Sequence, residues 1–338
     1  MKERLHYIDV CKGLLILLVI FHHIPYVFWQ IAQGPNEVMT DLRDYNFLHA
    51  SFFMSAFFLV SSFCSNFDKP IRKFAVSNLW SIVIPALLIG TVSQWIKQAL
   101  VHNYNFTIPL TYYFRQLTHG FEFWFISVLL ISRVLYYILH RCKASDIAIL
   151  AVSVCAIPLG FHLNNINFAH NIWHCNYVLC FFIWFPIGQL LRKHKEWLSK
   201  RNLLIAAAIY IVLTIVFIAT GTTVPRLKNH FAYPVIDCIP YVLFASTGSL
   251  LLIGVAKWIG SNRTLEYFGR QSLAIYILHG SVLHLTITIL FRLMAPTSYM
   301  GGVGFTIATI VFAAIGCALL TYLISGFKTL FNYLYTYK

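Results

Sequence analysis

The sequence predicts an all-α, polytopic membrane protein with about ten transmembrane helices and both termini in the cytoplasm. Three observations predict this class: an apolar composition, ten apolar segments of spanning length, and a one-sided distribution of Lys and Arg. Of the 338 residues, 59% are hydrophobic and 11% are charged, whereas a soluble domain carries about 25% charged residues. No stretch is polar enough to form a separate soluble domain, so we expect a single transmembrane domain over residues 1–338.

Apolar segments recur at lengths near the ~20 residues that a helix needs to cross about 30 Å of hydrocarbon. The expected spans are 12–31, 48–66, 78–96, 121–140, 146–161, 174–191, 203–220, 236–256, 272–292 and 303–325. The fifth is short and ends near Pro158, which predicts a tilted or broken helix. The basic start of the chain resembles a signal peptide, but Asp9 and Lys12 interrupt the apolar run, so we expect a retained first helix.

Lys and Arg lie mainly on one side of this arrangement. Eighteen of the 25 fall in segments on the side of the amino terminus, six fall in the opposite loops, and Arg133 lies inside the fourth span. By the positive-inside rule the richer side is cytoplasmic. The net charge of +14 then reflects this bias and attraction to anionic headgroups, and a nucleic-acid partner is not expected. The eight cysteines are scattered, so neither a metal site nor a disulfide framework is expected.

The stretch YIDVCKGLLILLVIFHH, residues 7–23, carries ionisable side chains into an apolar helix. Such groups are costly in lipid and indicate a functional site facing the interior of the bundle. Lys12 and His23 point to nearly the same face, about 16 Å apart along the axis, and Asp9 shares that face. His22 is rotated by about 100°. Imidazole exchanges protons near neutral pH, so His23 is a candidate general base; a histidine that only packs through hydrogen bonds is the alternative.

The same stretch resembles the opening of the membrane acyltransferase-3 family, in the variant typical of the fucose-4-O-acetylase branch. The matching residues are Arg4, Asp9 and Lys12, followed after a ten-residue gap by His23. Later segments similar to family motifs are FFMSAFFLVSSF (52–63), FWFISVLL (123–130), FFIWFPIGQLL (181–191) and LEYFGRQSLAIYILH (265–279). The resemblance covers nearly the whole chain, and its first and last motifs are the most specific.

The resemblance implies an integral-membrane O-acyltransferase of the bacterial cytoplasmic membrane. It implies transfer of an acyl group, usually acetyl, from cytosolic acyl-CoA to a hydroxyl of a carbohydrate or lipid-linked sugar at the outer side, with membrane lipids as further partners. His23 matches the essential histidine of the family, and His279 matches the late Tyr-x-x-His position together with Tyr276. Glu122 replaces a polar residue that is often found beside the tryptophan motif. We expect Asp9, His279 and Glu122 to assist His23.

Cations on the cytoplasmic side are the expected contacts for the phosphates of acyl-CoA. The candidates are Arg4, Lys12, Arg72 and Lys73, because charge-assisted hydrogen bonds suit phosphate. For Arg72 and Lys73 the alternative is ordinary positive-inside charge. Many family members carry an Arg-x-x-Arg pair before a proline of the third helix, whereas this chain has SNLWSIVIP (77–85). That pair is thought to hold the coenzyme, so the donor site departs from the family pattern.

Two alternatives stay open at this point. Direct attack by the acceptor hydroxyl and an acyl-enzyme on Ser, Tyr or His are both compatible with these residues. A transporter or flippase for a sugar-linked lipid or polysaccharide also fits ten helices with buried polar groups. Such a protein would predict an inverted repeat or broken helices in matched halves, and neither pattern is clear in the sequence.

Overall fold

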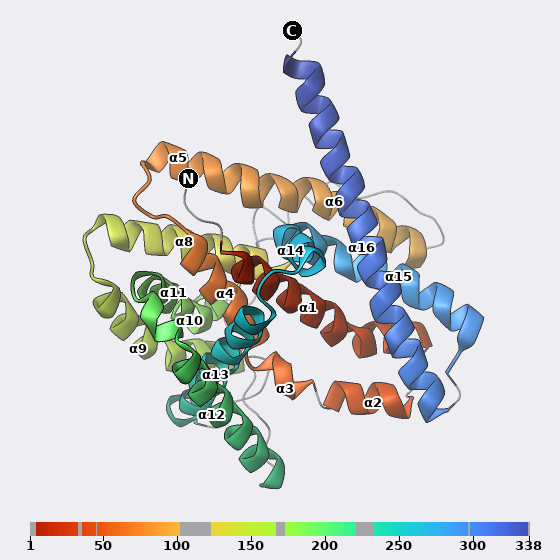
Figure 1. Ribbon diagram of the computed structural model, residues 1–338, viewed down its shortest axis with the longest axis horizontal. Coiled ribbons are helices and arrows are strands. Elements are labelled where there is room, and N and C mark those ends of the chain that lie inside the picture. The colour runs from red at the N-terminus through yellow and green to blue at the C-terminus, as the bar shows by residue number, and fades with distance from the viewer. Residues whose placement is uncertain are drawn as a thin grey trace. The chain divides into compact units, whose positions relative to one another are not determined.

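The computed structural model describes residues 5–32, 36–44, 46–101, 123–166, 173–220, 233–296 and 298–336. Within these ranges the chain is helical and has no strand (Figure 1). The helices are α1 (His6–Ala32), α2 (Glu37–Asp44), α3 (Phe47–Ala50), α4 (Phe53–Cys64), α5 (Ile71–Asn78), α6 (Ile84–Val101), α8 (Trp124–Arg141), α9 (Asp146–Asn165), α10 (Cys175–Phe181), α11 (Trp184–Lys193), α12 (Lys200–Ala219), α13 (Pro234–Ile259), α14 (Arg263–Arg270), α15 (Ser272–Met294) and α16 (Tyr299–Thr336). A π-helical turn, Leu79–Val83, joins α5 to α6, and a 3-10 turn, Lys195–Leu198, precedes α12.

Ten stretches of the described chain are long and apolar enough to cross a membrane. They are His6–Ala32, Glu37–Cys64, Ile71–Lys97, Trp124–Arg141, Asp146–Asn165, Cys175–Lys193, Lys200–Ala219, Pro234–Ile259, Ser272–Met294 and Tyr299–Gly326. Each coincides with one of the spans expected from the sequence. The all-α, multi-pass fold class is therefore confirmed.

Two compact units make up the chain. Unit 1 comprises Met1–Cys11, Phe47–Ala86 and Ile108–Ser261. Unit 2 comprises Lys12–Asn46, Leu87–Thr107 and Asn262–Lys338. The division passes through α1 and α6, and the single domain expected from the sequence stays a prediction.

Unit 1 is organised around α4, in which nearly every residue is buried. This helix packs against α11 and α13, and α13 also packs against α9 and α12. The ring of Phe58 lies 4.9 Å from that of Phe125 and 4.8 Å from that of Phe181, centroid to centroid. Gly188 lets α11 approach closely, because a Cβ there would lie 2.5 Å from the carbonyl oxygen of Leu59. Small residues at such contacts let membrane helices pack closely.

Unit 2 contains most of α1 and of α6, and the helices α2, α14, α15 and α16. α15 packs against α14 and α16, and α16 also packs against α2. Ser93 of α6 and Ser281 of α15 share a hydrogen bond of 2.7 Å between their Oγ atoms. Ser93 Oγ is also 2.9 Å from the carbonyl oxygen of Ile277. Hydrogen bonds of this kind join membrane helices whose apolar surfaces gain little from leaving lipid.

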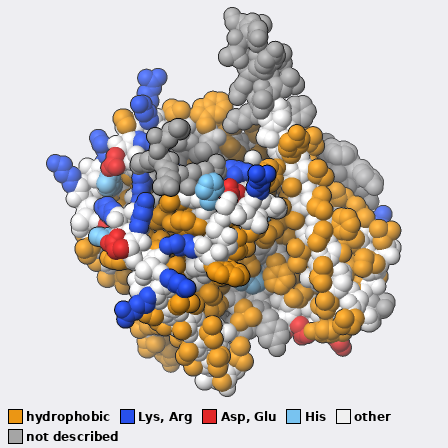
Figure 2. Space-filling view, in the orientation of Figure 1, with side chains coloured by type: hydrophobic (Ala, Val, Ile, Leu, Met, Phe, Trp, Pro, Cys, Tyr) orange, Lys and Arg blue, Asp and Glu red, His pale blue; other side chains and the backbone are white. Residues whose placement is uncertain are grey.

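The surface of both units is rich in large apolar side chains (Figure 2). α12 exposes Leu204, Ile211 and Ile215, for example, and α16 exposes Val311 and Phe312. Large contiguous apolar surfaces are rare on soluble monomers and are normal on helices that face lipid.

Exposed cations of unit 1 gather at three helix connections, α4–α5, α8–α9 and α11–α12 (Figure 2). They are Lys69, Arg72, Lys73, Arg141, Lys143, Lys193, Lys195, Lys200 and Arg201. All nine belong to the side that the sequence predicts to be cytoplasmic. Contacts between these connections, described below, show that they lie together within unit 1.

Of the two alternatives expected for the fifth span, a break at Pro158 is wrong, and a tilted helix stays a prediction. α9 runs from Asp146 to Asn165 with Pro158 in its interior. Proline removes one backbone donor from a helix, and inside a membrane bundle neighbouring groups satisfy the carbonyl that it frees.

The third span begins earlier than expected, at Ile71. α5 continues through the π-helical turn into α6 just before Pro85, so the helix is not interrupted at 78. Such turns often occur at functional sites. Arg72 and Lys73 therefore lie in the first turn of a helix, and both are exposed.

Candidate active site

α1 and α15 bring two histidines together in unit 2. The rings of His23 and His279 lie 4.8 Å apart between centroids, with their planes at 64°. His279 is buried, and His23 is half-buried. The ring of Tyr276 lies 5.5 Å from that of His279. The two histidines that the sequence singled out on separate helices are thus neighbours.

A backbone carbonyl lies against Nδ1 of each ring. Nδ1 of His23 is 2.8 Å from the oxygen of Val19, and Nδ1 of His279 is 2.6 Å from the oxygen of Tyr276. A carbonyl oxygen only accepts hydrogen bonds, so each Nδ1 carries the proton and donates it. In the neutral ring the lone pair then lies on Nε2. Both histidines are therefore oriented by their own helices with Nε2 as the proton acceptor.

His22 has different neighbours. Its ring lies 5.2 Å from that of His23 and 5.5 Å from that of Tyr26. Its carbonyl oxygen accepts a hydrogen bond of 3.2 Å from Nδ2 of Asn46. Asn46 is 1% exposed, and its Oδ1 has no hydrogen-bond partner among the described residues. Sequence reasoning missed Asn46, because one Asn beyond a short amphipathic stretch gives no signal of burial.

Gly13, of the Lys-Gly pair in the first motif, has a packing role. A Cβ at Gly13 would lie 2.1 Å from the carbonyl oxygen of Leu265 in α14. Only glycine permits so close an approach of the two backbones. Leu265 begins the late motif, and α14 leads through Gln271 into α15, which carries His279. The two most specific segments of the resemblance therefore touch within unit 2.

The other predicted site residues belong to α1 and α5 or lie outside the described residues. Arg4 and Glu122 lie outside the described residues. Asp9 is half-buried in the first turn of α1, where the helix dipole favours an acidic side chain. Lys12 is half-buried on the same helix, about 16 Å along the axis from His23. The roles of these residues, and of the exposed Arg72 and Lys73, stay predictions.

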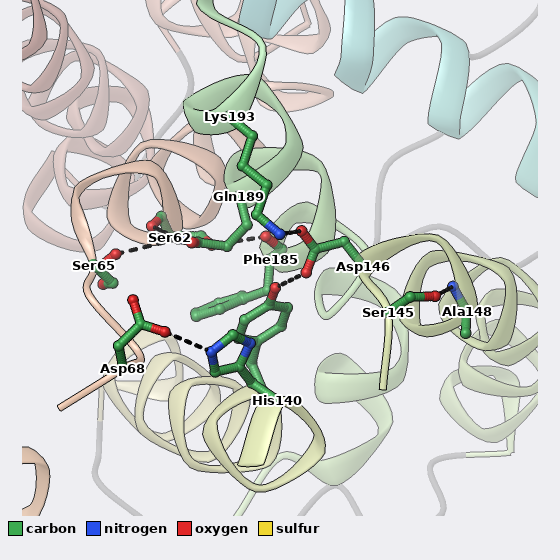
Figure 3. Close-up of polar contacts among 11 residues, drawn as sticks. Ser62, Ser65, Asp68, His140, Ser145, Asp146, Ala148, Phe185, Gln189 and Lys193 are labelled. Carbon is green, nitrogen blue, oxygen red and sulfur yellow. Dashed lines mark hydrogen bonds and ion pairs between the residues drawn. The ribbon is translucent and has the colours of Figure 1, made fainter. Parts of the chain in front are cut away.

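A second polar group joins helix ends of unit 1 (Figure 3). Nζ of Lys193 is 2.6 Å from Oδ2 of Asp146, whose Oδ1 accepts a hydrogen bond from the hydroxyl of Tyr136. Nε2 of His140 donates to Oδ1 of Asp68 at 2.9 Å. This hydrogen bond lowers the pKa of Asp68 below its ordinary value. These contacts tie the α4–α5, α8–α9 and α11–α12 connections together.

A further set of hydrogen bonds in unit 1 surrounds Arg133, the cation inside the fourth span. Nε of Arg133 donates to Oδ1 of Asn78 at 2.8 Å, and Nη1 donates to Oγ of Ser65 at 2.8 Å. Gln189 of α11 donates to the carbonyl oxygen of Ser62 beside them (Figure 3). Sequence reasoning left Arg133 without a role, because its partners come from other helices. In the described part of the chain, no group of three or more His, Cys, Asp or Glu is placed to hold a metal ion.

A ten-span helical fold with a pair of histidines oriented as proton acceptors defines a membrane protein equipped for acid–base chemistry. Residues 5–324 match the family model Acyl_transf_3, described as an acyltransferase domain. The chain therefore belongs to the acyltransferase-3 family, as the sequence predicted. Neither the search of curated proteins nor the search of solved structures finds a match. The assignment to the fucose-4-O-acetylase branch stays a prediction.

Proposed function

We propose that the protein transfers an acyl group, most simply acetyl, from cytosolic acyl-CoA to a hydroxyl of a sugar or polysaccharide precursor at the outer side. The family match supports acyl transfer. The contact between His23 and His279 is the observation that carries the mechanism. The fucose-4-O-acetylase-like motif supports acetyl and a sugar as the two reactants. The distribution of Lys and Arg supports both termini in the cytoplasm, and the family resemblance supports a bacterial cytoplasmic membrane.

In the proposed reaction, Nε2 of His23 removes the proton from the acceptor hydroxyl as its oxygen attacks the thioester carbonyl. A carbon–oxygen bond forms, the carbon–sulfur bond breaks, and the proton passes from His23 to the departing thiolate of CoA. His279 acts as a positioning residue. When His23 is protonated, the lone pair on the neighbouring Nε2 of His279 stabilises the imidazolium, as an orienting partner does in other acyl-transfer sites.

The remaining predicted site residues are proposed either to bind the acyl-CoA donor or to assist His23. Arg4, Lys12, Arg72 and Lys73 are the proposed contacts of the phosphates, and Asp9 and Glu122 are proposed to assist His23. The distance along α1 from Lys12 to His23, about 16 Å, is comparable to the extended pantetheine arm. A donor whose phosphates lie near Lys12 would present its thioester close to His23.

The test is transfer of labelled acetyl from acetyl-CoA in membranes that contain the protein. We expect His23→Ala to reduce transfer by about 100-fold or more, because general-base catalysis contributes about that much. His22→Ala is the matched control and should keep most of the activity, since His22 contacts Asn46 through its backbone. Normal transfer by His23→Ala would remove the base assignment. A wild-type protein that consumes no acetyl-CoA but moves a sugar-linked lipid would be a transporter.

The acceptor can be identified separately. Comparing surface polysaccharide by NMR in cells with and without the gene should show acetyl signals that depend on the protein. Unchanged spectra would point to an acceptor outside the polysaccharide.

A further inference from the structure

Arg133 is a cation held inside unit 1 by neutral partners. Nε donates to Asn78, and Nη1 donates to Ser65 at 2.8 Å and to Ser61 at 3.4 Å. The structure gives Nη2 no hydrogen bond to any described residue. Three oxygen dipoles therefore orient this guanidinium without neutralising its charge.

Arg192 contacts the same residue, Ser65, as Arg133 does. Its Nη1 donates to the carbonyl oxygen of Ser65, the residue whose hydroxyl binds Arg133. Neither arginine makes an ion pair within the part of the chain that the structure describes. Asp146 is engaged by Lys193, and Asp68, which accepts from His140, is close enough to Arg192 for their charges to attract (Figure 3).

The C-terminal end of α4 attracts cations, but this attraction alone does not explain why two arginines meet there. Ser65 follows the last residue of α4, and a helix C-terminus attracts cations. The helix dipole is equivalent to only about half a negative charge, however. Arg133, whose partners are all neutral, therefore leaves positive charge in a partly buried place, where an unpaired charge is costly. The geometry calls for an anion.

Phosphate is the anion that fits best. The planar fork of Arg matches phosphate oxygens, and the exposed Lys69, Arg72 and Lys73 of the α4–α5 connection, close to Ser65 in the chain, raise the local concentration of anions. Asn78 belongs to the segment 77–85, where this chain lacks the basic pair of the family pattern. Here Asn78 holds an arginine supplied by α8 instead.

We propose that Arg133 and Arg192 bind a phosphate group of the acyl-CoA donor. The identity of the donor rests on the proposed function, whereas the anion site rests on the contacts of the two arginines. A phospholipid headgroup offers the same chemistry and is distinguished below.

Cys64 provides a test in the unmodified protein. It is exposed at the end of α4, next to Ser65, whose hydroxyl binds Arg133. The rate of maleimide labelling of Cys64 is measured by peptide mass spectrometry in phosphatidylcholine nanodiscs, with acetyl-CoA or adenosine 3′,5′-bisphosphate as probe. We expect either probe to slow the labelling about threefold or more, because a phosphate bound beside Ser65 would cover the adjacent thiol. Cys142, exposed after α8, is the control and should be unaffected.

Two results would overturn the proposal. One is an unchanged Cys64 rate at acetyl-CoA concentrations that support transfer, which would leave the acyltransferase function intact. The other is slowing by phosphatidylglycerol nanodiscs alone, with no effect of acetyl-CoA, which would assign the site to a lipid headgroup. Wild-type protein that neither binds nor consumes acetyl-CoA would instead refute the proposed function itself.

Substitutions give an independent measurement. We expect Arg133→Gln to raise the KM for acetyl-CoA about 10- to 100-fold, the range for losing a charge-assisted hydrogen bond. Arg133→Lys keeps the charge without the fork and should recover part of the loss. Arg201→Gln, an exposed cation of the neighbouring connection, removes the same charge and should change KM little. Equal KM values for the Arg133→Gln and Arg201→Gln variants would overturn the proposal.

Discussion

Replacing Gly13 by alanine tests whether the approach of α1 to α14 positions the histidine pair. The added Cβ would lie 2.1 Å from the carbonyl oxygen of Leu265. Close carbon–oxygen contacts in proteins are about 3.3 Å, so the two backbones must separate by about 1.2 Å. The added Cβ is fixed directly to the backbone of α1, and the carbonyl oxygen belongs to the backbone of α14. The strain therefore cannot be relieved by rotating a side chain.

The cost to stability is modest. Overpacking of a close contact costs about 1–3 kcal/mol, and alanine in a helix interior recovers up to about 1 kcal/mol relative to glycine. The effect on the reaction is larger. α14 leads directly into α15, and a shift of about 1 Å at reacting groups costs about 100-fold in rate. We therefore expect Gly13→Ala to fold and to lose most of its acetyl transfer.

The assay compares kcat for acetyl transfer with the thermal unfolding temperature in detergent. Gly304→Ala is the matched control, because a Cβ on Gly304 of α16 would meet nothing within 4 Å. This variant should keep its rate and unfold at the same or a higher temperature. A Gly13→Ala variant with wild-type kcat would show that the contact with Leu265 does not position the histidines.

Three further predictions follow from individual contacts. His279→Ala should lower kcat about 10- to 100-fold with little change in the KM for acetyl-CoA, and His279→Gln should restore part of it; wild-type kcat in His279→Ala would contradict the positioning role. Ser93→Ala and Ser281→Ala should each destabilise the protein by about 0.6 kcal/mol, and the double variant should cost less than their sum, as measured by a double-mutant cycle. The hydrogen bond from His140 lowers the pKa of Asp68 in the folded protein. The ionised carboxylate therefore adds to the free energy of unfolding above its unfolded-state pKa, and this contribution is lost as the pH falls through the folded-state pKa. Asp68→Asn should therefore be slightly less stable than wild type at neutral pH, by under about 1 kcal/mol, with the difference vanishing in acid; a constant difference would exclude this linkage.

The class of protein and its helices follow from the sequence because lipid imposes strong, local constraints. Every backbone polar group must be satisfied within its own segment, so each span needs a long apolar helix, and such runs are visible without any tertiary information. An ionisable residue in such a run is equally conspicuous, which is why His23 was found from the residues alone, whereas His279 was found through the family resemblance. The break expected at Pro158 failed because neighbours in a bundle can satisfy the carbonyl that a proline frees.

Tertiary structure alone decided which of these groups act together. The contact between His23 and His279 depends on how α1 and α15 lie in unit 2, whereas the protonation of each ring at Nδ1 is set within its own helix. The role proposed for Arg133 depends on partners from other helices. Hydrogen bonds and charges act over a few ångströms of space, whatever the separation of the residues along the chain. The sequence by itself therefore determined the membrane class and the candidate residues, and the packing of the helices determined the site.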